Sequence, residues 1–183
     1  MRWPLPGHAH IPGRTSTADP RLEEILTRMD SQPDRLVQRG QYGCQLFEAG
    51  FYWEAHEAWE PVWHAARPNS AAGLLVQAAI ALANAALKIR MHQPRAARRL
   101  TSRARSLLAG CPPAAELEKL HPDRLAELAD WLEAAGLDSL EKAERKHGQK
   151  HDPDKESPAD AGTAPQKQAR LAELAAGLSL QGK

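Results

Sequence analysis

The segment from about Asn69 to Met91 most constrains the fold, because it is apolar on almost every side of a helix. Asn69 and Ser70 are typical of a helix N-cap. The large apolar residues that follow are spread around the helix instead of along one stripe, and they are Leu74, Leu75, Val76, Ile80, Leu82, Leu87 and Ile89. Such a helix is stable in water only when other elements surround it. The sequence therefore predicts a central, buried helix.

The rest of the chain predicts further helices and no strands. There is no alternation of β-branched residues, and no Asn-Gly or Asp-Gly turn that would indicate a hairpin. Caps, prolines and apolar spacing predict helices over residues 21–29, 34–49, 52–66, 94–110 and 122–135. Gly50 and Gly136 are expected to end two of them, with residues 137–146 adding a turn or two. The predicted fold class is all-α, a single helical bundle of antiparallel helix pairs.

Composition divides the 183 residues into one domain and two tails. Residues 1–20 hold four prolines and should form an extended, proline-rich arm. Residues 21–147 should form the bundle, and the 42% of apolar residues in the chain suffices for a core. Residues 148–183 are polar and rich in proline, which predicts a disordered tail with a weak terminal helix. Removing residues 150–183 is therefore expected to leave the melting temperature nearly unchanged.

The sequence also predicts a cytoplasmic protein that does not enter a membrane. Cys44 and Cys111 are too few for a disulfide framework, and the N-terminus opens no apolar run of the kind that signal peptides have. The longest apolar stretch, from Gly73 to Leu87, contains two amide side chains and is shorter than a membrane span. The formal net charge of +1 excludes polyanion binding by bulk charge alone.

One predicted helix, residues 52–66, carries an unusual set of side chains. Seven of the nine aromatic residues fall between Tyr42 and Trp63, so this region holds most of the aromatic surface of the chain. On a helical wheel, one face is apolar and consists of Ala55, Ala58, Trp59 and Val62, with Trp63 at its edge. Beside it runs a polar stripe of His56, Glu57, Glu60 and His64. Residues four apart are neighbours on a helix, so the histidines flank the Glu60 carboxylate.

The polar stripe has two interpretations. In the first, it is a buried polar network that pairs with Gln77 and Asn84, the polar stripe of the central helix, while Trp53 and Trp63 line the groove between the two helices. In the second, His56, Glu60 and His64 are metal ligands, and Glu57 is the general base of a metal-dependent hydrolase. The spacing is not that of zincins, which need a second histidine at position 60.

The same helix carries a family resemblance. The run Gly50-Phe51-Tyr52-Trp53-Glu54-Ala55-His56-Glu57-Ala58-Trp59-Glu60-Pro61-Val62-Trp63 resembles the signature of the helical "domain of unknown function 309" family. The segments 73–83, with its Gln77, and 93–100 are similar to two further blocks of that family, and residues 5–14 resemble the arm of some longer members. The resemblance thus covers roughly residues 4–110. It implies an all-helical bundle with no assigned activity.

A basic segment gives a third interpretation. Between Pro61 and Ala115 there is no acidic residue, and five arginines share one face of the helix 94–110. These are Arg95, Arg98, Arg99, Arg103 and Arg105. Such a face can bind phosphate groups or RNA, but no aromatic residue stands among these arginines to stack on bases. Acidic segments elsewhere in the chain are expected to pair with this face instead.

The function that the sequence favours is therefore a non-enzymatic binding or scaffolding domain. Its site would be the groove between the helix 53–64 and the Gln77–Asn84 face, its partner an unidentified protein or small molecule, and it would need no cofactor. The metal-dependent hydrolase, with a divalent metal, and the phosphate or RNA binder are the alternatives. Homo-oligomerisation stays open.

Overall fold

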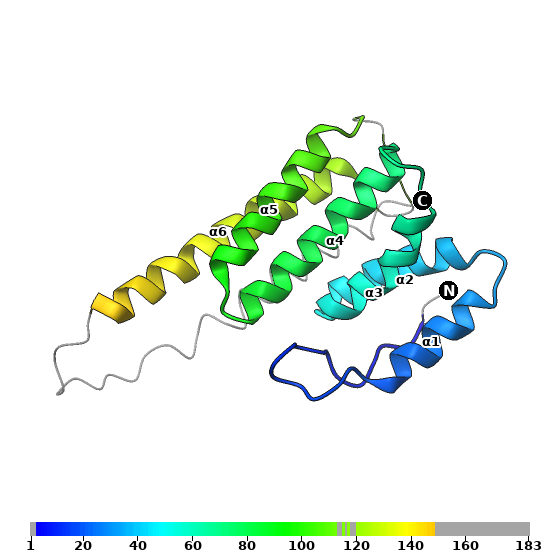
Figure 1. The fold of residues 1–183 in the computed structure, drawn as a ribbon, viewed down its shortest axis with the longest axis horizontal. Helices are drawn as coiled ribbons and strands as arrows, with labels where there is room; N and C mark the ends of the chain where they lie inside the picture. The colour runs from blue at the N-terminus through cyan, green and yellow to red at the C-terminus, as the bar shows by residue number, and fades with distance from the viewer. Residues whose placement is uncertain (1–2, 113–114, 116, 118–119, 149–183) are drawn as a thin grey trace.

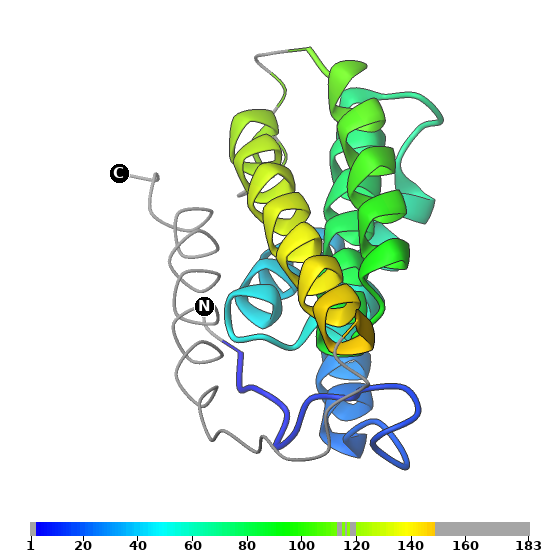
Figure 2. The same cartoon turned by 90° about the vertical axis from the view of Figure 1, so that its left-hand side faces the viewer.

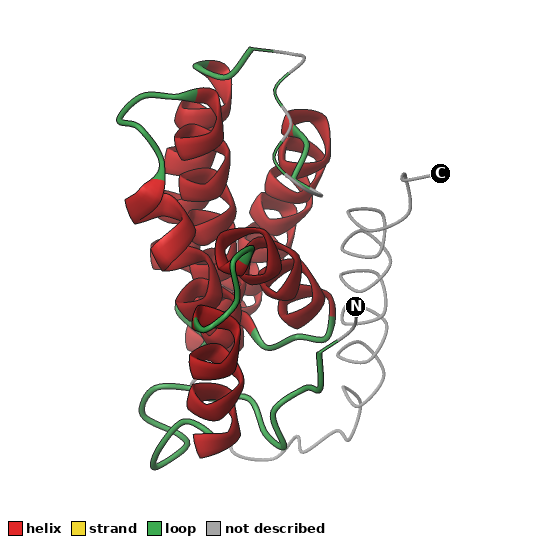
Figure 3. Ribbon diagram, turned by 90° about the vertical axis from the view of Figure 1, so that its right-hand side faces the viewer, coloured by secondary structure: helices red, strands yellow, loops and turns green. Residues whose placement is uncertain are grey.

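The computed structural model describes residues 3–112, 115, 117 and 120–148, and within them six α-helices make up the fold (Figure 1). They are α1 (Pro20–Asp30), α2 (Arg35–Glu48), α3 (Tyr52–Ala65), α4 (Ala71–Arg90), α5 (Pro94–Ala109) and α6 (Pro122–Gly148). Figure 3 shows only helices and loops, and the single β feature of the described part is an isolated bridge between Leu117 and Leu120. The all-α prediction is confirmed. Of the C-terminal tail predicted over residues 148–183, Gly148 belongs to α6 and the rest lies outside the described residues.

The helix α4 occupies the centre, as its all-round apolar character predicts. It packs against α3, α5 and α6, while α2 packs against α3 and α1 against α2. Figures 1 and 2 show α4, α5 and α6 running along one another, with the α2–α3 pair beside them and α1 at the edge. The side chains of Leu75, Val76 and Leu82 are fully buried, so α4 is the core around which the other helices assemble.

The sequence argument that this apolar stretch is too short for a membrane was wrong about its length. The helix extends from Ala71 to Arg90, and by length and composition alone it is long enough to cross a bilayer. Of its most apolar window, 56% is buried against the other helices. The core helix of a bundle has this property as well, and burial in the bundle is how the structure accommodates it.

Two glycines that were expected to end helices behave differently. Gly50 has a φ of +83°, and the amide groups of Gly50 and Phe51 donate to the carbonyls of Phe47 and Leu46, which closes α2 with a Schellman motif. Gly136 does not end a helix, because α6 continues without interruption to Gly148. Unlike Gly50, Gly136 has no left-handed conformation, and it stays helical and buried beside the start of α5.

The contact between α2 and α3 depends on a glycine. Trp59 of α3 is 1% exposed, and its indole Nε1 donates a hydrogen bond of 3.0 Å to the carbonyl of Gly40 in α2. One turn further along α2, a Cβ atom on Gly43 would lie 2.3 Å from that same Nε1. The absence of a side chain at Gly43 therefore makes room for the indole ring.

Pro61 lies inside α3, and the helix nevertheless continues through it. Proline has no N–H group, so the carbonyl of Glu57, four residues earlier, loses its helical partner. The guanidinium of Arg39 in α2 donates to that carbonyl through Nη1 at 3.4 Å. Arg39 is 6% exposed and also binds Asp30 at the end of α1, through Nε at 3.0 Å and Nη2 at 2.5 Å. A single buried arginine of α2 therefore binds both the end of α1 and the carbonyl in α3 that the proline leaves without a helical partner.

The N-terminal arm is held to α2 and α3 mainly through its backbone. The hydroxyl of Tyr42 donates to the carbonyl of Pro4 at 2.8 Å, and Nε2 of Gln45 donates to the carbonyl of Trp3 at 2.5 Å. The amide of His10 donates to Oε1 of Glu54 at 2.6 Å. Among the apolar side chains of the arm, Leu5 remains 39% exposed, whereas Pro6 is buried and Trp3 packs against the core. The arm is thus fixed by three polar side chains of the helix pair.

Glu54 predicts a pH-dependent stability. Burial raises the pKa of this carboxyl, although the hydrogen bond from the His10 amide opposes the shift, and Oε2 has no partner. A raised pKa in the folded chain means that Glu54 adds stability at low pH and that this stability is lost as the pH rises through the raised pKa. Glutamine keeps an acceptor for His10 and carries no charge. We expect the free energy of unfolding of Glu54→Gln, relative to wild type, to increase from about pH 4 to about pH 7 in urea titrations. A constant difference would contradict the assignment.

Candidate functional site

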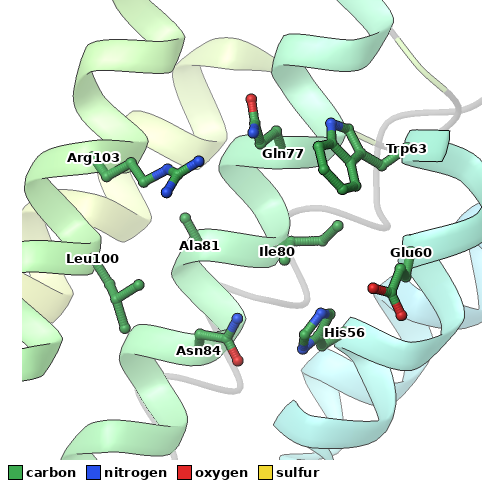
Figure 4. Close-up of a pocket in the computed structure, with 9 residues that line it drawn as sticks. All are labelled: His56, Glu60, Trp63, Gln77, Ile80, Ala81, Asn84, Leu100 and Arg103. Carbon is green, nitrogen blue, oxygen red and sulfur yellow. The ribbon is translucent and has the colours of Figure 1, made fainter.

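A pocket of about 170 Å³ lies between α3, α4 and α5 (Figure 4). Its lining combines polar and apolar side chains from all three helices. They are His56, Glu60 and Trp63 of α3, Gln77, Ile80, Ala81 and Asn84 of α4, and Leu100 and Arg103 of α5. A concave site with a few convergent polar groups on an apolar floor is the usual form of a small-molecule site.

Helical spacing explains how these residues come together. On α3 and α4 the polar lining residues lie one or two turns apart, so each set occupies one face of its helix. Because α3 and α4 are antiparallel, Trp63 lies at the same end of the pocket as Gln77, and His56 at the same end as Asn84, as Figure 4 shows. Ile80 and Ala81 lie between these two ends. Arg103 approaches from α5, on the opposite side of the pocket from His56 and Glu60.

The predicted polar network is not formed. Throughout the described part of the chain, no hydrogen bond connects His56 or Glu60 with Gln77 or Asn84. All four side chains are only half-buried and they border the same pocket. The sequence therefore identified side chains that face one another, but a pocket separates them.

Two of the predicted site residues lie elsewhere. Trp53 and Glu57 line a second pocket, of about 440 Å³, between α1 and α3. Glu60 borders both pockets, so it stands on the ridge between them. The lining of the second pocket also contains Asp19 and Asp30, whose carboxylates are already engaged, Asp19 by the Gly7 amide and Asp30 by Arg39.

The side chains that lie close enough together to share a metal ion are not the set that the sequence predicted. The potential ligand atoms of His56, Glu57 and Glu60 all lie within 4.8 Å of one another, and the three side chains are half-buried. His64 does not belong to this group: it is exposed, and its Nε2 lies 3.8 Å from Oε1 of Glu60. Burial raises the pKa of Glu57, with the charge of Glu60 acting in the same direction and that of His56 in the opposite one.

The five arginines of α5 have different surroundings. Arg105 forms ion pairs with Asp130 and Glu133 of α6, the latter at 2.7 Å. Arg103 lines the pocket, as described above. All five arginines are exposed, and the remaining three, Arg95, Arg98 and Arg99, do not line the pocket. The expected pairing with acidic segments is thus found for Arg105. The five arginines of this helix face do not share one kind of surroundings.

Sequence reasoning missed Glu54 and Arg39, two buried charged residues that hold the scaffold of the site. Glu54 precedes Ala58 by four residues, so the helical wheel does place it on the buried side of α3. That position was the available signal. No such signal marks Arg39 in the sequence. Its burial depends on contacts with the end of α1 and with the Glu57 carbonyl, which Pro61 leaves without a helical partner.

Comparison with known proteins gives one match. The model of the family described as "Domain of unknown function (DUF309)" matches residues 41–100. Neither the curated proteins nor the solved structures contain a match to the chain. The matched segment includes every residue that lines the α3–α4–α5 pocket except Arg103. Over residues 41–100, about a third of its length, the chain is therefore similar to a family whose description assigns no function.

Proposed function

We propose that the chain is a non-enzymatic binding domain that takes a small anionic molecule into the α3–α4–α5 pocket. The observation that carries this proposal is the convergence of polar side chains from three helices on one pocket. Of these, the side chains of Gln77, Asn84 and Arg103 make no hydrogen bond or ion pair with any other described residue. Groups that are held on rigid helices and remain free are available to a ligand.

The chemistry of the lining indicates the class of ligand. The Arg103 guanidinium presents paired N–H groups, which match carboxylate and phosphate oxygens. The amides of Gln77 and Asn84 both donate and accept hydrogen bonds, so they suit a ligand with several polar atoms. Trp63, Ile80 and Leu100 supply apolar contact. The pocket therefore favours a compact carboxylate or phosphate compound over a purely apolar one.

Titration of the full chain with citrate and with inorganic phosphate, followed by NMR, tests this proposal. We expect either anion to move the indole N–H resonance of Trp63, because this ring lines the pocket. Arg103→Gln should weaken the affinity at least about tenfold, since a charge-assisted hydrogen bond contributes roughly 1.5–3 kcal/mol. The Trp63→Phe variant lacks this indole N–H, so the resonance that disappears from its spectrum is that of Trp63.

Arg99→Gln is the matched control for this titration. Arg99 is on the same helix and exposed, but it does not line the pocket, and its replacement removes the same charge. The affinity of Arg99→Gln should equal that of wild type. Equal losses in the two variants would show that the anions bind the basic surface and not the pocket, and an unmoved Trp63 resonance would contradict the proposal.

A second proposal, phosphate or RNA binding by the arginine face, rests on the exposure of Arg95, Arg98 and Arg99. Binding of this kind depends on several cations together and decreases steeply with salt. Retention of the chain on heparin that decreases with salt, and that a triple replacement of these arginines by glutamine abolishes, would support it.

A further inference from the structure

We infer that His56, Glu57 and Glu60 bind one divalent metal ion of the zinc or manganese type at the edge of the α3–α4–α5 pocket. Their ligand atoms lie within 4.8 Å of one another. Metal–ligand distances of about 2.0–2.2 Å place two ligands on opposite sides of an ion about 4.4 Å apart at most. Small side-chain rotations on α3 therefore suffice to bring all three atoms onto one ion.

The surroundings leave these three side chains available. Within the described chain, the His56 imidazole and the Glu57 carboxylate make no hydrogen bond, and the only ion pair of Glu60 is the long, exposed one with His64. The charge nearest to Glu57 from another helix is that of Arg39, which is already neutralised by Asp30. A cation at this place would relieve the repulsion between two carboxylates that lie one turn apart on one helix.

The donor set indicates the class of ion. One imidazole nitrogen with two carboxylates suits zinc, manganese and ferrous ions, whereas calcium and magnesium prefer oxygen ligands alone. His56 and Glu60 line the pocket, so the coordination positions that the protein leaves open would face it. Because Glu57 is a ligand in this arrangement, it is not a separate general base, and the inference concerns binding of the ion without hydrolysis.

The first experiment measures melting of the full chain with EDTA and with zinc chloride. Zinc at about 100 times its dissociation constant should raise the melting temperature by about 5 °C. His56→Ala and Glu60→Gln should each weaken zinc binding at least roughly tenfold in calorimetric titrations, because losing even a residue that only orients a metal ligand typically costs about 10–100-fold. His64→Ala, which removes an exposed neighbour of Glu60, should bind zinc as wild type does.

The second experiment locates the ion. Manganese chloride should broaden the NMR resonance of the Trp63 indole at substoichiometric amounts in wild type and not in His56→Ala. Failure of zinc to change the melting temperature, an undiminished response in His56→Ala, or an equal loss in His64→Ala would each overturn the inference. Arg103→Gln separates it from the proposed function, because this variant should lose anion binding and retain zinc binding.

Discussion

Replacing Gly43 by alanine is expected to destabilise the protein by on the order of 3 kcal/mol or more. The new Cβ would lie 2.3–2.5 Å from three atoms of the Trp59 indole, distances that no real contact tolerates. The ring is fully buried and bonded to the Gly40 carbonyl, so it cannot swing into solvent. α2 and α3 must therefore separate, or the indole must leave its position. Urea unfolding followed by circular dichroism gives the loss of stability.

Gly136→Ala is the control with the opposite expected sign. Gly136 also lies inside a buried part of a helix, but the nearest atom to its Cβ position is 3.9 Å away. Alanine favours the helix over glycine by about 1 kcal/mol, so this variant should be more stable than wild type. If both variants lost stability equally, the general sensitivity of buried glycines, and not the Trp59 contact, would explain the first result.

Arg39→Ala is expected to cost about 2 kcal/mol or more. The substitution removes the pair with Asp30 and takes away the guanidinium donor that the Glu57 carbonyl has in place of an N–H at Pro61. Asp30 is about half-exposed and can be solvated, so the larger part of the cost should come from the carbonyl and from the packing lost in the interior. Chemical denaturation measures the loss.

A double-mutant cycle with Pro61→Ala isolates the contribution of the carbonyl. Alanine at position 61 supplies the missing N–H to Glu57, so Arg39 is no longer needed there. Arg39→Ala should therefore cost roughly 1 kcal/mol less in the Pro61→Ala background than in wild type. Additive effects of the two substitutions would show that the Arg39 contact with the carbonyl contributes nothing.

Most of the fold was predictable because the signals are local. Caps, prolines and apolar spacing act within a few residues, and they indicate where α1 to α5 lie and that α4 is central. The end predicted at Gly136 was wrong because this glycine does not adopt the left-handed conformation that Gly50 has, and α6 continues through it beside the start of α5. The conformation of such a residue depends on tertiary structure, which local sequence does not encode.

The candidate site was predictable in its members but not in its form. Spacing along α3 and α4 identified His56, Glu60, Trp63, Gln77 and Asn84 as facing residues. Whether such side chains bond directly or border a pocket depends on the distance between the helices. That distance follows from the packing of all three helices of the site, and the contribution of Arg103 depends on the position of α5. Neither the distance between the helices nor the position of α5 can be predicted from the spacing of residues along one helix.

The attachment of the arm has a consequence for the order of events during synthesis. Residues 3–19 leave the ribosome before Tyr42, Gln45 and Glu54 do, and these three residues hold the arm. The nascent arm therefore has no surface to bind until α2 and α3 have emerged and paired. Its docking follows that pairing, so that a segment translated before both helices takes its place only after they have paired.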